Sequence, residues 1–271
     1  MIQRILSSKL IWVWPTDIAD YSLCPWKTYY RRVLGIYLEA TGPMAIGWME
    51  HEAWRRFYSY LDNNMAVSEP AVNLLVSRSA SEALDWALLG FDHYPSSLRS
   101  HIPELELILS REATRIASKL SKNAPPESVL PLLTEASFSS PELGIRGRVD
   151  LVYKSGDGYE PWDIKTGKPP SELLDSYMLQ VTAYALLLES NYKCHVKSGG
   201  LRLTALGVDQ SFPVTHQLRE EVIKIAESIR SMLLTGKRPT VERLTLPHCE
   251  RCGFLKVCQE FVGKKIEVRD G

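Results

Sequence analysis

Two aspartates and a lysine near the middle of the chain have the spacing of a metal-dependent hydrolytic site. Gly156 and Asp157 lie midway between Asp150 and Asp163. If they form the two-residue turn of a hairpin, residues equally distant from the turn lie opposite each other, and Asp150 faces Asp163. Two like charges opposed across a strand pair require a compensating cation. A divalent metal ion held by both carboxylates would activate water against a phosphodiester, with Lys165 beside the attacking water.

The hairpin residues also have an explanation without chemistry. In the same register Arg148 faces Lys165, while Leu151 faces Trp162 on the opposite, apolar side. The two basic residues would then simply pair with the aspartates on a solvated face, and the hairpin alone does not distinguish the two interpretations. Pro161 complicates the register, because proline cannot donate to a strand ladder and a slip of one residue would separate the aspartates.

A second group of chemically active residues lies near the end of the chain, in the stretch HCERCGFLKVC. Its cysteines would supply three ligands of a tetrahedral metal site, and these are Cys249, Cys252 and Cys258. The spacing leaves the fourth ligand open among three candidates: Cys24, Cys194 and His248. Four thiolates suit zinc or an iron-sulfur cluster equally, whereas a site completed by His248 would be a local zinc site.

The composition is that of an ordinary globular protein. The chain has 271 residues, of which 45% are hydrophobic, and 32 basic residues balance 32 acidic ones. No overall field therefore draws the protein to nucleic acid, and DNA contacts would depend on local patches. No apolar run approaches the roughly 18 residues of a membrane span, and the first residues are too few and too charged for a signal peptide. We expect a cytoplasmic protein with reduced cysteines and no membrane partner.

The elements that must position these residues begin with a helical first half. Apolar residues recur at helical spacing in three stretches, 44–61, 71–91 and 104–122. A short strand over 10–14 precedes a helix that starts at Thr16 or Asp17. Prolines, among them Pro103, mark the breaks between helices.

From about Leu130 the pattern changes to that of a sheet. Short alternating runs predict strands at 132–140, 144–153, 158–166, 199–206 and 211–215. Helices are predicted at 171–190 and at 217–234, the second of which ends before Gly236. We expect an α/β fold organised as one integrated domain. Its parts are a mainly helical region (1–128), a sheet-based core (129–236) and a cysteine segment (237–271).

Three short motifs in chain order resemble those of one nuclease family. GRVD ends at Asp150, DIK runs from Asp163 to Lys165, and QVTAY runs from Gln180 to Tyr184. They resemble the GxxD, (D/E)xK and QxxxY motifs of the RecB-like branch of the PD-(D/E)xK nuclease superfamily. Each motif alone arises by chance in many chains, whereas the ordered set is much more specific.

The resemblance implies a restriction-endonuclease-like core sheet flanked by helices and a particular set of metal ligands. Asp150 and Asp163 would bind the metal, His51 would be a further ligand, and Glu135 stands where a supporting acid is often found. Without the motif order, His51 would more often be an ordinary surface or core histidine, because the chain has six histidines.

The same resemblance completes the catalytic group with Lys165, Gln180 and Tyr184. Gln180 and Tyr184 are four residues apart and so share one face of a helix, from which they would help to hold DNA and the carboxylates. Without the neighbouring motifs, they would be polar residues on a helix that faces the core.

The cysteine pattern matches the iron-sulfur subset of the same branch. In that subset Cys24, Cys249, Cys252 and Cys258 would hold the cluster, which is preferably 4Fe-4S with 2Fe-2S as the alternative. The cluster would tie the N-terminal region to the C-terminal segment, and Cys194 would be left without a partner. Within the subset, the free-standing CRISPR-associated nucleases of the fourth Cas family are the most similar.

These resemblances imply a Mg²⁺- or Mn²⁺-dependent DNA exonuclease that acts on single-stranded ends. Its expected role is to trim DNA before insertion into a CRISPR array, with the CRISPR integrase complex as a partner. Basic residues interleaved with aromatics at 27–32 and 54–57, and Lys168, are candidate contacts to a single strand, unless the aromatics belong to the core. The alternative function is a non-catalytic DNA-binding subunit of a repair or recombination complex, stabilised by zinc or a cluster.

Overall fold

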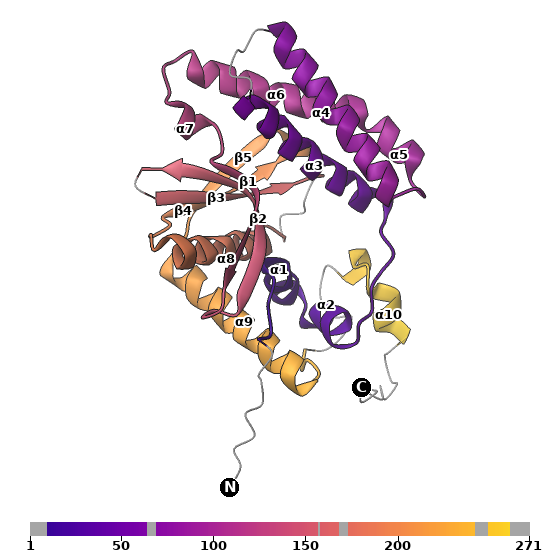
Figure 1. Cartoon of the computed structure of the whole chain (residues 1–271). Helices are drawn as coiled ribbons and strands as arrows, with labels where there is room; N and C mark the ends of the chain where they lie inside the picture. Colours follow the sequence, from indigo (N-terminus) through magenta and orange to yellow (C-terminus); the bar gives the residue numbers. More distant parts are fainter. Residues whose placement is uncertain (1–9, 64–68, 157, 168–172, 242–248, 261–271) are drawn as a thin grey trace, which may run out of the picture.

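A central sheet separates two layers of helices in this protein (Figure 1). The structure is a computed structural model of the chain and describes residues 10–63, 69–156, 158–167, 173–241 and 249–260. Long helices from the first half of the chain lie on one side of the sheet, and helices from the second half lie on the other. None of the helices in the described ranges is both long and apolar enough to cross a membrane.

The sheet has five strands in the order β1-β2-β3-β4-β5. Their bounds are β1 (Leu133–Ser140), β2 (Ile145–Ser155), β3 (Gly158–Lys165), β4 (Ser198–Leu203) and β5 (Val208–Pro213). β3 and β4 are parallel, and the other neighbours are antiparallel. Parallel neighbours need a crossover connection, which here is the helix α8 (Leu174–Tyr192). This sheet flanked by helices confirms the predicted fold class.

The helices of the first half follow the predicted apolar spacing. The three predicted stretches correspond to α3 (Gly42–Asn63), α4 (Glu69–Gly90) and α6 (Ile102–Leu120). Two short helices were not predicted, α5 (Pro95–Ser100) and α7 (Pro126–Val129), and each begins at a proline. Pro103 marks a break between helices as predicted, since α5 ends at Ser100 and α6 begins at Ile102. The proline lies in the first turn of α6, where the missing N–H costs no helical hydrogen bond.

The chain enters the fold through a short helix rather than a strand. Of the predicted strand over 10–14, the structure has only a bridge between Val13 and Ile145. The helix α1 (Pro15–Leu23) then begins at a proline, and the Asp17 carboxylate in its first turn accepts the N–H of Trp14 at 3.0 Å. The next elements are α2 (Pro25–Thr28) and a π-helical turn η1 (Tyr29–Val33).

The second half ends as the turn residues predict. α9 (His216–Thr235) stops at Gly236, whose φ of 64° is left-handed. Residues 204–206 form a 3₁₀ turn, η3 (Thr204–Leu206), and the last strand accordingly lies three residues earlier than predicted. η4 (Cys249–Arg251) and α10 (Leu255–Glu260) complete the elements. The first residues of the predicted helix 171–190 lie outside the described residues.

The predicted hairpin register is confirmed near the turn and lost at the aspartates. Gly156 has a φ of 56°, and the β2–β3 pairs run from Ser155 with Gly158 to Leu151 with Trp162. Pro161 fits opposite Val152 in this ladder without a slip.

The aspartates themselves are not a ladder pair. The Asp150 Oδ2 accepts the backbone N–H of Ile164 at 2.8 Å, so a side chain takes the place of the next ladder contact. From Trp162 onward β3 pairs with β4 instead. The predicted pair of Asp150 and Asp163 is therefore wrong as backbone pairing, although both residues lie at the same end of the hairpin.

Apolar side chains on both faces of the sheet fix its position between the helix layers. Leu151, Tyr153 and Ile164 pack with the core of α3, α4 and α6. Val149 and Val152 pack with residues of α8 on the opposite face, where α9 and α1 extend the core. The hairpin that carries the aspartates is therefore enclosed from both sides.

A glycine in β4 makes room for the Trp162 ring of the neighbouring strand β3. A Cβ at Gly200 would lie 2.3 Å from atoms of the Trp162 ring, which is far inside contact distance. We expect Gly200→Ala to lower the free energy of unfolding by about 1–3 kcal/mol through overpacking, measured by urea denaturation. Gly90→Ala is the matched control, because a Cβ there meets nothing within 4 Å. An equal effect of the two substitutions would contradict this account of the β3–β4 contact.

Candidate active site

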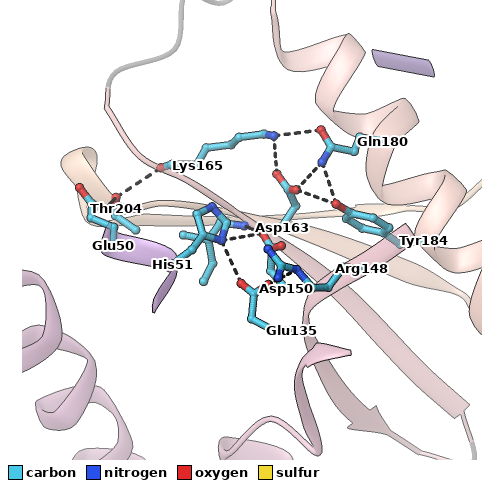
Figure 2. A network of polar contacts seen from close by, with 11 residues as sticks. Glu50, His51, Glu135, Arg148, Asp150, Asp163, Lys165, Gln180, Tyr184 and Thr204 are labelled. Carbon is cyan, nitrogen blue, oxygen red and sulfur yellow. Dashed lines mark hydrogen bonds and ion pairs between the residues drawn. The ribbon is translucent and has the colours of Figure 1, made fainter. Parts of the chain in front are cut away.

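Three side chains from separate elements meet beside the β2–β3 hairpin (Figure 2). His51 comes from α3, Glu135 from β1 and Asp150 from β2. The His51 Nδ1 lies 3.1 Å from Glu135 Oε1 and 3.7 Å from Asp150 Oδ2. One ligand atom of each side chain lies within 4.8 Å of the other two. An imidazole nitrogen and two carboxylate oxygens at this separation can hold a divalent metal ion.

Glu135 reaches this group through an unusual backbone conformation. The β1–β2 ladder pairs Thr134 with Leu151 and Ala136 with Val149, but it is interrupted between these pairs, where Glu135 lies next to Asp150. Glu135 has a φ of 49°, which is the left-handed region that a residue with a Cβ rarely adopts. This conformation costs on the order of 1–2 kcal/mol, so the surrounding strands must hold it in place.

The crowding of carboxylates displaces two pKa values in this group. Burial opposes a charged imidazole, but the charge of Asp150 and the hydrogen bond with Glu135 outweigh it and raise the pKa of His51 to about 9. Burial raises the pKa of Asp150 to about 7, and the charges of Asp163 and Glu135 add to this shift against the effect of His51. Each group thus keeps a proton to a higher pH than it would in water.

Asp163 is held by a second group of side chains that includes two residues of α8. Gln180 Nε2 donates to Asp163 Oδ1 and to the Tyr184 hydroxyl, both at 2.8 Å. Gln180 Oε1 accepts from Lys165 Nζ at 2.9 Å, and the same Nζ lies 2.9 Å from Asp163 Oδ2. Figure 2 shows these contacts as a closed network around the Asp163 carboxylate.

Lys165 and Tyr184 stay protonated in this network. Burial opposes the charged ammonium, but the nearby Asp163 carboxylate outweighs it and raises the pKa of Lys165. Burial raises the pKa of Tyr184 well above its ordinary value, so its hydroxyl, 3.4 Å from Asp163 Oδ1, remains a donor. The Lys165 ammonium also lies 4.3 Å from the centre of the Tyr177 ring.

The geometry differs from the predicted ligand set in one member. With His51 and Asp150 it brings Glu135 within ligand distance, while the Asp163 carboxylate turns toward α8. The Oδ2 of Asp163 and the Oε2 of Glu135 are buried and accept no hydrogen bond from the described residues, although a cationic side chain lies at ion-pair distance from each. Buried oxygens with free lone pairs suit a cation, so the donor set fits a divalent metal ion.

Arg148 does not face Lys165 as the hairpin register predicts. Its Nε lies 2.6 Å from Glu135 Oε2, and its side chain is 63% exposed. The register fails here because β3 has already left β2 to pair with β4. Arg148 therefore compensates Glu135 from the solvent side, where its guanidinium is accessible to a phosphate.

A buried contact on the other side of α3 fixes the position of His51. The neighbouring Glu50 is 2% exposed, accepts the Thr204 hydroxyl at 3.0 Å and lies 2.8 Å from the His101 ring. Thr204 Oγ1 also lies 3.3 Å from the backbone oxygen of Lys165 (Figure 2). No role for Glu50, Thr204 or His101 was predicted, because no motif links residues so far apart in the chain.

The cysteines approach one another from the two ends of the described chain. Burial raises the pKa of Cys24, and the nearby thiols of Cys252 and Cys249 add to the shift. Among the described residues, no three cysteine sulfurs lie within 4.8 Å of one another, so a formed metal site is not seen there. Cys194 packs elsewhere, against the core beside α8. His248, the local alternative ligand, lies outside the described residues.

Aromatic packing holds these two segments together. Cys24, Cys252 and Cys258 border a core group that includes Trp26 and Phe254. The Trp26 indole N–H donates across the fold to the backbone oxygen of Val241 at 2.7 Å. Figure 1 accordingly shows α2 and α10 as neighbours, although they lie at opposite ends of the sequence.

The aromatic rings of the patches at 27–32 and 54–57 are not available to stack on a single strand as proposed from the sequence. Tyr29, Tyr30 and Trp54 are at most 3% exposed and pack in the core. The arginines of both patches form ion pairs with acidic side chains, as Arg31 does with Asp17 at 2.7 Å. The alternative of core aromatics with solvated charges is correct for these stretches. Lys168 lies outside the described residues.

The fold and site geometry agree with a comparison against known protein families. The family model of the PD-(D/E)XK nuclease superfamily matches residues 15–259. The chain belongs to this superfamily, as the ordered motifs predict.

A more particular similarity links the chain to a CRISPR-associated protein. The chain is 26% identical over 129 residues to a CRISPR-associated exonuclease Cas4/endonuclease Cas1 fusion from Leptospira interrogans serogroup Icterohaemorrhagiae serovar Lai (strain 56601). The match covers 45% of this chain and 23% of the fusion protein, so it spans less than a quarter of the relative. The crystal structure of SSO0001 is similar over 89% of this chain and 95% of that chain, at 15% identity and a TM-score of 0.33, which supports no conclusion.

The displaced pKa values predict that metal binding strengthens as the pH rises. A divalent ion needs a neutral imidazole and an ionised carboxylate, so it must displace protons that His51 keeps to about pH 9 and Asp150 to about pH 7. We expect the affinity for Mn²⁺ to rise between pH 6 and pH 9 by roughly tenfold per pH unit for each proton displaced. Calorimetric titration in buffers of different ionisation enthalpy counts these protons.

His51→Ala should reduce the pH dependence above pH 7, because it removes one of the two displaced protons. His93→Ala is the matched control, since the His93 side chain is 88% exposed and its ion-pair partner is Asp92 rather than a carboxylate of the site. An affinity for Mn²⁺ that is independent of pH in the wild-type protein would contradict this account of the site.

Proposed function

We propose that the protein is a Mg²⁺- or Mn²⁺-dependent DNA exonuclease that acts on single-stranded ends. The observation that carries the proposal is a buried pair of carboxylates, Asp150 and Asp163, with Lys165 fixed 2.9 Å from Asp163 Oδ2. All three side chains line one cleft of about 660 Å³, together with His51 and Glu135. Membership of a nuclease superfamily supports phosphodiester hydrolysis as the reaction.

Each residue of the site has a role that follows from its contacts. His51, Asp150 and Asp163 would hold the metal ion, Asp163 through the Oδ2 that accepts no hydrogen bond from the described residues, with Glu135 as a further ligand beside His51 and Asp150. A bound Mg²⁺ or Mn²⁺ would supply a Lewis acid and lower the pKa of a coordinated water. Lys165 stays charged beside Asp163, so it can orient that water and stabilise negative charge that develops at the phosphate.

Gln180 and Tyr184 act on the reaction through Asp163. Their hydrogen bonds occupy Oδ1 and fix the rotation of the carboxylate. The other oxygen, Oδ2, therefore stays beside the Lys165 ammonium. Gln180 also fixes the Lys165 ammonium through its Oε1. The two residues of α8 thus fix the Asp163 carboxylate and the Lys165 ammonium relative to each other.

We also propose an iron-sulfur cluster held by Cys24, Cys249, Cys252 and Cys258, with 4Fe-4S preferred over 2Fe-2S. Burial and then the nearby thiols of Cys252 and Cys249 raise the pKa of Cys24, and Cys24 and Cys252 border the same core group, which supports their proximity. Their surroundings are largely apolar and aromatic, which protects a cluster from solvent. The cluster would fasten the N-terminal helices to the C-terminal segment.

The biological role that we propose is the trimming of DNA ends before their insertion into a CRISPR array. The relative from Leptospira joins a CRISPR-associated exonuclease to an endonuclease in one protein, which supports an association between this chain and the CRISPR integrase complex. This work would take place in the cytoplasm. The alternative is a non-catalytic DNA-binding subunit of a repair or recombination complex.

Substitution of Asp163 tests the nuclease activity. We expect Asp163→Ala to lower the rate of cleavage of end-labelled single strands by about 100-fold or more in Mg²⁺ or Mn²⁺, because both the carboxylate and its hold on Lys165 are lost. Asp92→Asn is the matched control, since that side chain is 81% exposed. If wild-type protein cuts no faster than Asp163→Ala, the non-catalytic alternative is favoured.

Metal analysis tests the cluster separately. We expect anaerobically purified protein to be coloured and to contain iron and acid-labile sulfide, with both lost in Cys258→Ser and retained in Cys194→Ser. The loss should also lower the midpoint of thermal unfolding, because the two ends of the chain are no longer tied. A colourless wild-type protein loaded with zinc would exclude the iron-sulfur cluster.

A further inference from the structure

The exposed tryptophans of this protein gather at a single place. The chain has seven tryptophans, all within the described residues, and three of them are exposed: Trp14 by 38%, Trp48 by 50% and Trp86 by 42%. All three line the cleft that contains Asp150 and Asp163. Exposed indole rings are costly, because tryptophan is a large and mostly buried side chain, so a cluster of them at a reactive site indicates contact with a ligand.

The three rings reach the cleft from different elements. Trp14 directly precedes α1, Trp48 lies on α3, and Trp86 lies on α4. Figure 1 shows α1 on one side of the sheet and α3 with α4 on the other. A strand that enters the cleft would therefore meet rings on more than one side.

Trp48 lies on the same side of α3 as His51, the proposed metal ligand. Trp48, His51 and Arg55 are spaced at i, i+3 and i+7 along α3, and all three line the cleft. The Trp48 ring lies 4.7 Å from the ring of Phe91, which supports it from behind. A base stacked on Trp48 would therefore lie about one helical turn from the reacting phosphodiester.

Positive charges accompany the rings at the same cleft. Arg55 and Arg148 both line the cleft and are 44% and 63% exposed, although each also pairs with a carboxylate, Arg55 with Glu52 and Arg148 with Glu135. The guanidinium of Arg146 lies over one face of the Trp14 ring, 4.6 Å from its centre, so a base would stack on the other face of that indole. Rings for bases and guanidinium groups for phosphates form the combination that binds single-stranded nucleic acid.

We propose that Trp14, Trp48 and Trp86 stack on unpaired bases and thereby select single strands over duplex. The proposal rests on the nuclease function, for which it names the residues that hold the substrate. Bases in a single strand have free faces for an indole, whereas those of a duplex are stacked on one another. The cleft of about 660 Å³ lies in the range of pockets that hold small ligands, so a short single-stranded segment can enter it.

The contribution of base stacking is separable from that of phosphate binding. A strand of abasic sites has the same phosphates as an ordinary strand but has no bases. The test therefore compares the affinity of each variant for a labelled oligothymidine with its affinity for an abasic strand of equal length, by fluorescence anisotropy in Mg²⁺. All proteins carry Asp163→Ala to prevent cleavage.

We expect Trp48→Ala and Trp86→Ala each to weaken binding of oligothymidine by about tenfold and to leave binding of the abasic strand unchanged. Trp48→Phe should restore most of the affinity, because phenylalanine keeps a ring against which a base can stack. The matched control is Tyr37→Ala, which removes an aromatic ring that is 77% exposed outside the cleft. Unchanged binding in both tryptophan variants, or equal losses on the two strands, would overturn the stacking proposal.

A cleavage assay keeps this proposal distinct from the proposed function. If wild-type protein cuts DNA while Trp48→Ala and Trp86→Ala bind oligothymidine normally, only the stacking proposal fails. If wild-type protein cuts nothing, the nuclease function fails whatever the binding results are. Tryptophan variants that bind DNA normally but no longer associate with an integrase would identify the cleft rim as a protein-binding surface and would also overturn the proposal.

Discussion

The compensation of carboxylate charge in a buried position is the constraint on which the rest of this structure depends. Asp150 and Asp163 are 7% and 1% exposed, and Glu135 adjoins Asp150. Three acids at such low exposure repel one another strongly, because the interior screens charge poorly. His51 from one helix layer and Lys165 from the sheet compensate part of this charge. Carboxylate oxygens that accept no hydrogen bond from the described residues remain available to a metal ion.

The topology of the sheet brings hydrogen-bond donors to these buried carboxylates. Because β3 leaves β2 at Trp162 to run parallel to β4, the Asp163 side chain comes under α8, the helix that makes the crossover. Gln180 and Tyr184 then donate hydrogen bonds to the buried Asp163 carboxylate, in place of the water that would solvate an exposed one. The same crossover therefore builds the sheet and orients the reactive acid, so that stability and chemistry depend on one unit of the chain.

Periodicity and turn chemistry predicted most of the fold, including the five strands, the long helices and the hairpin register near Gly156. The motifs also identified the residues that meet in the cleft. The left-handed Glu135 and the role of Glu50 depend on contacts between distant segments, and no local pattern indicates them. The prediction that the rings at 27–32 and 54–57 contact DNA was wrong for the same reason. A sequence in which an aromatic residue adjoins a charged one does not show whether the ring faces solvent or the core.

The adjacent residues Glu50 and His51 give α3 a mechanical property. Neighbours on a helix point about 100° apart, so one turns toward Thr204 and the other toward Glu135. A helix held at two angles cannot roll about its axis without breaking one of the contacts. Since Trp48 belongs to the same helix, the orientation of its ring and the position of the imidazole are set together, and a change in the helical layer would alter both at once.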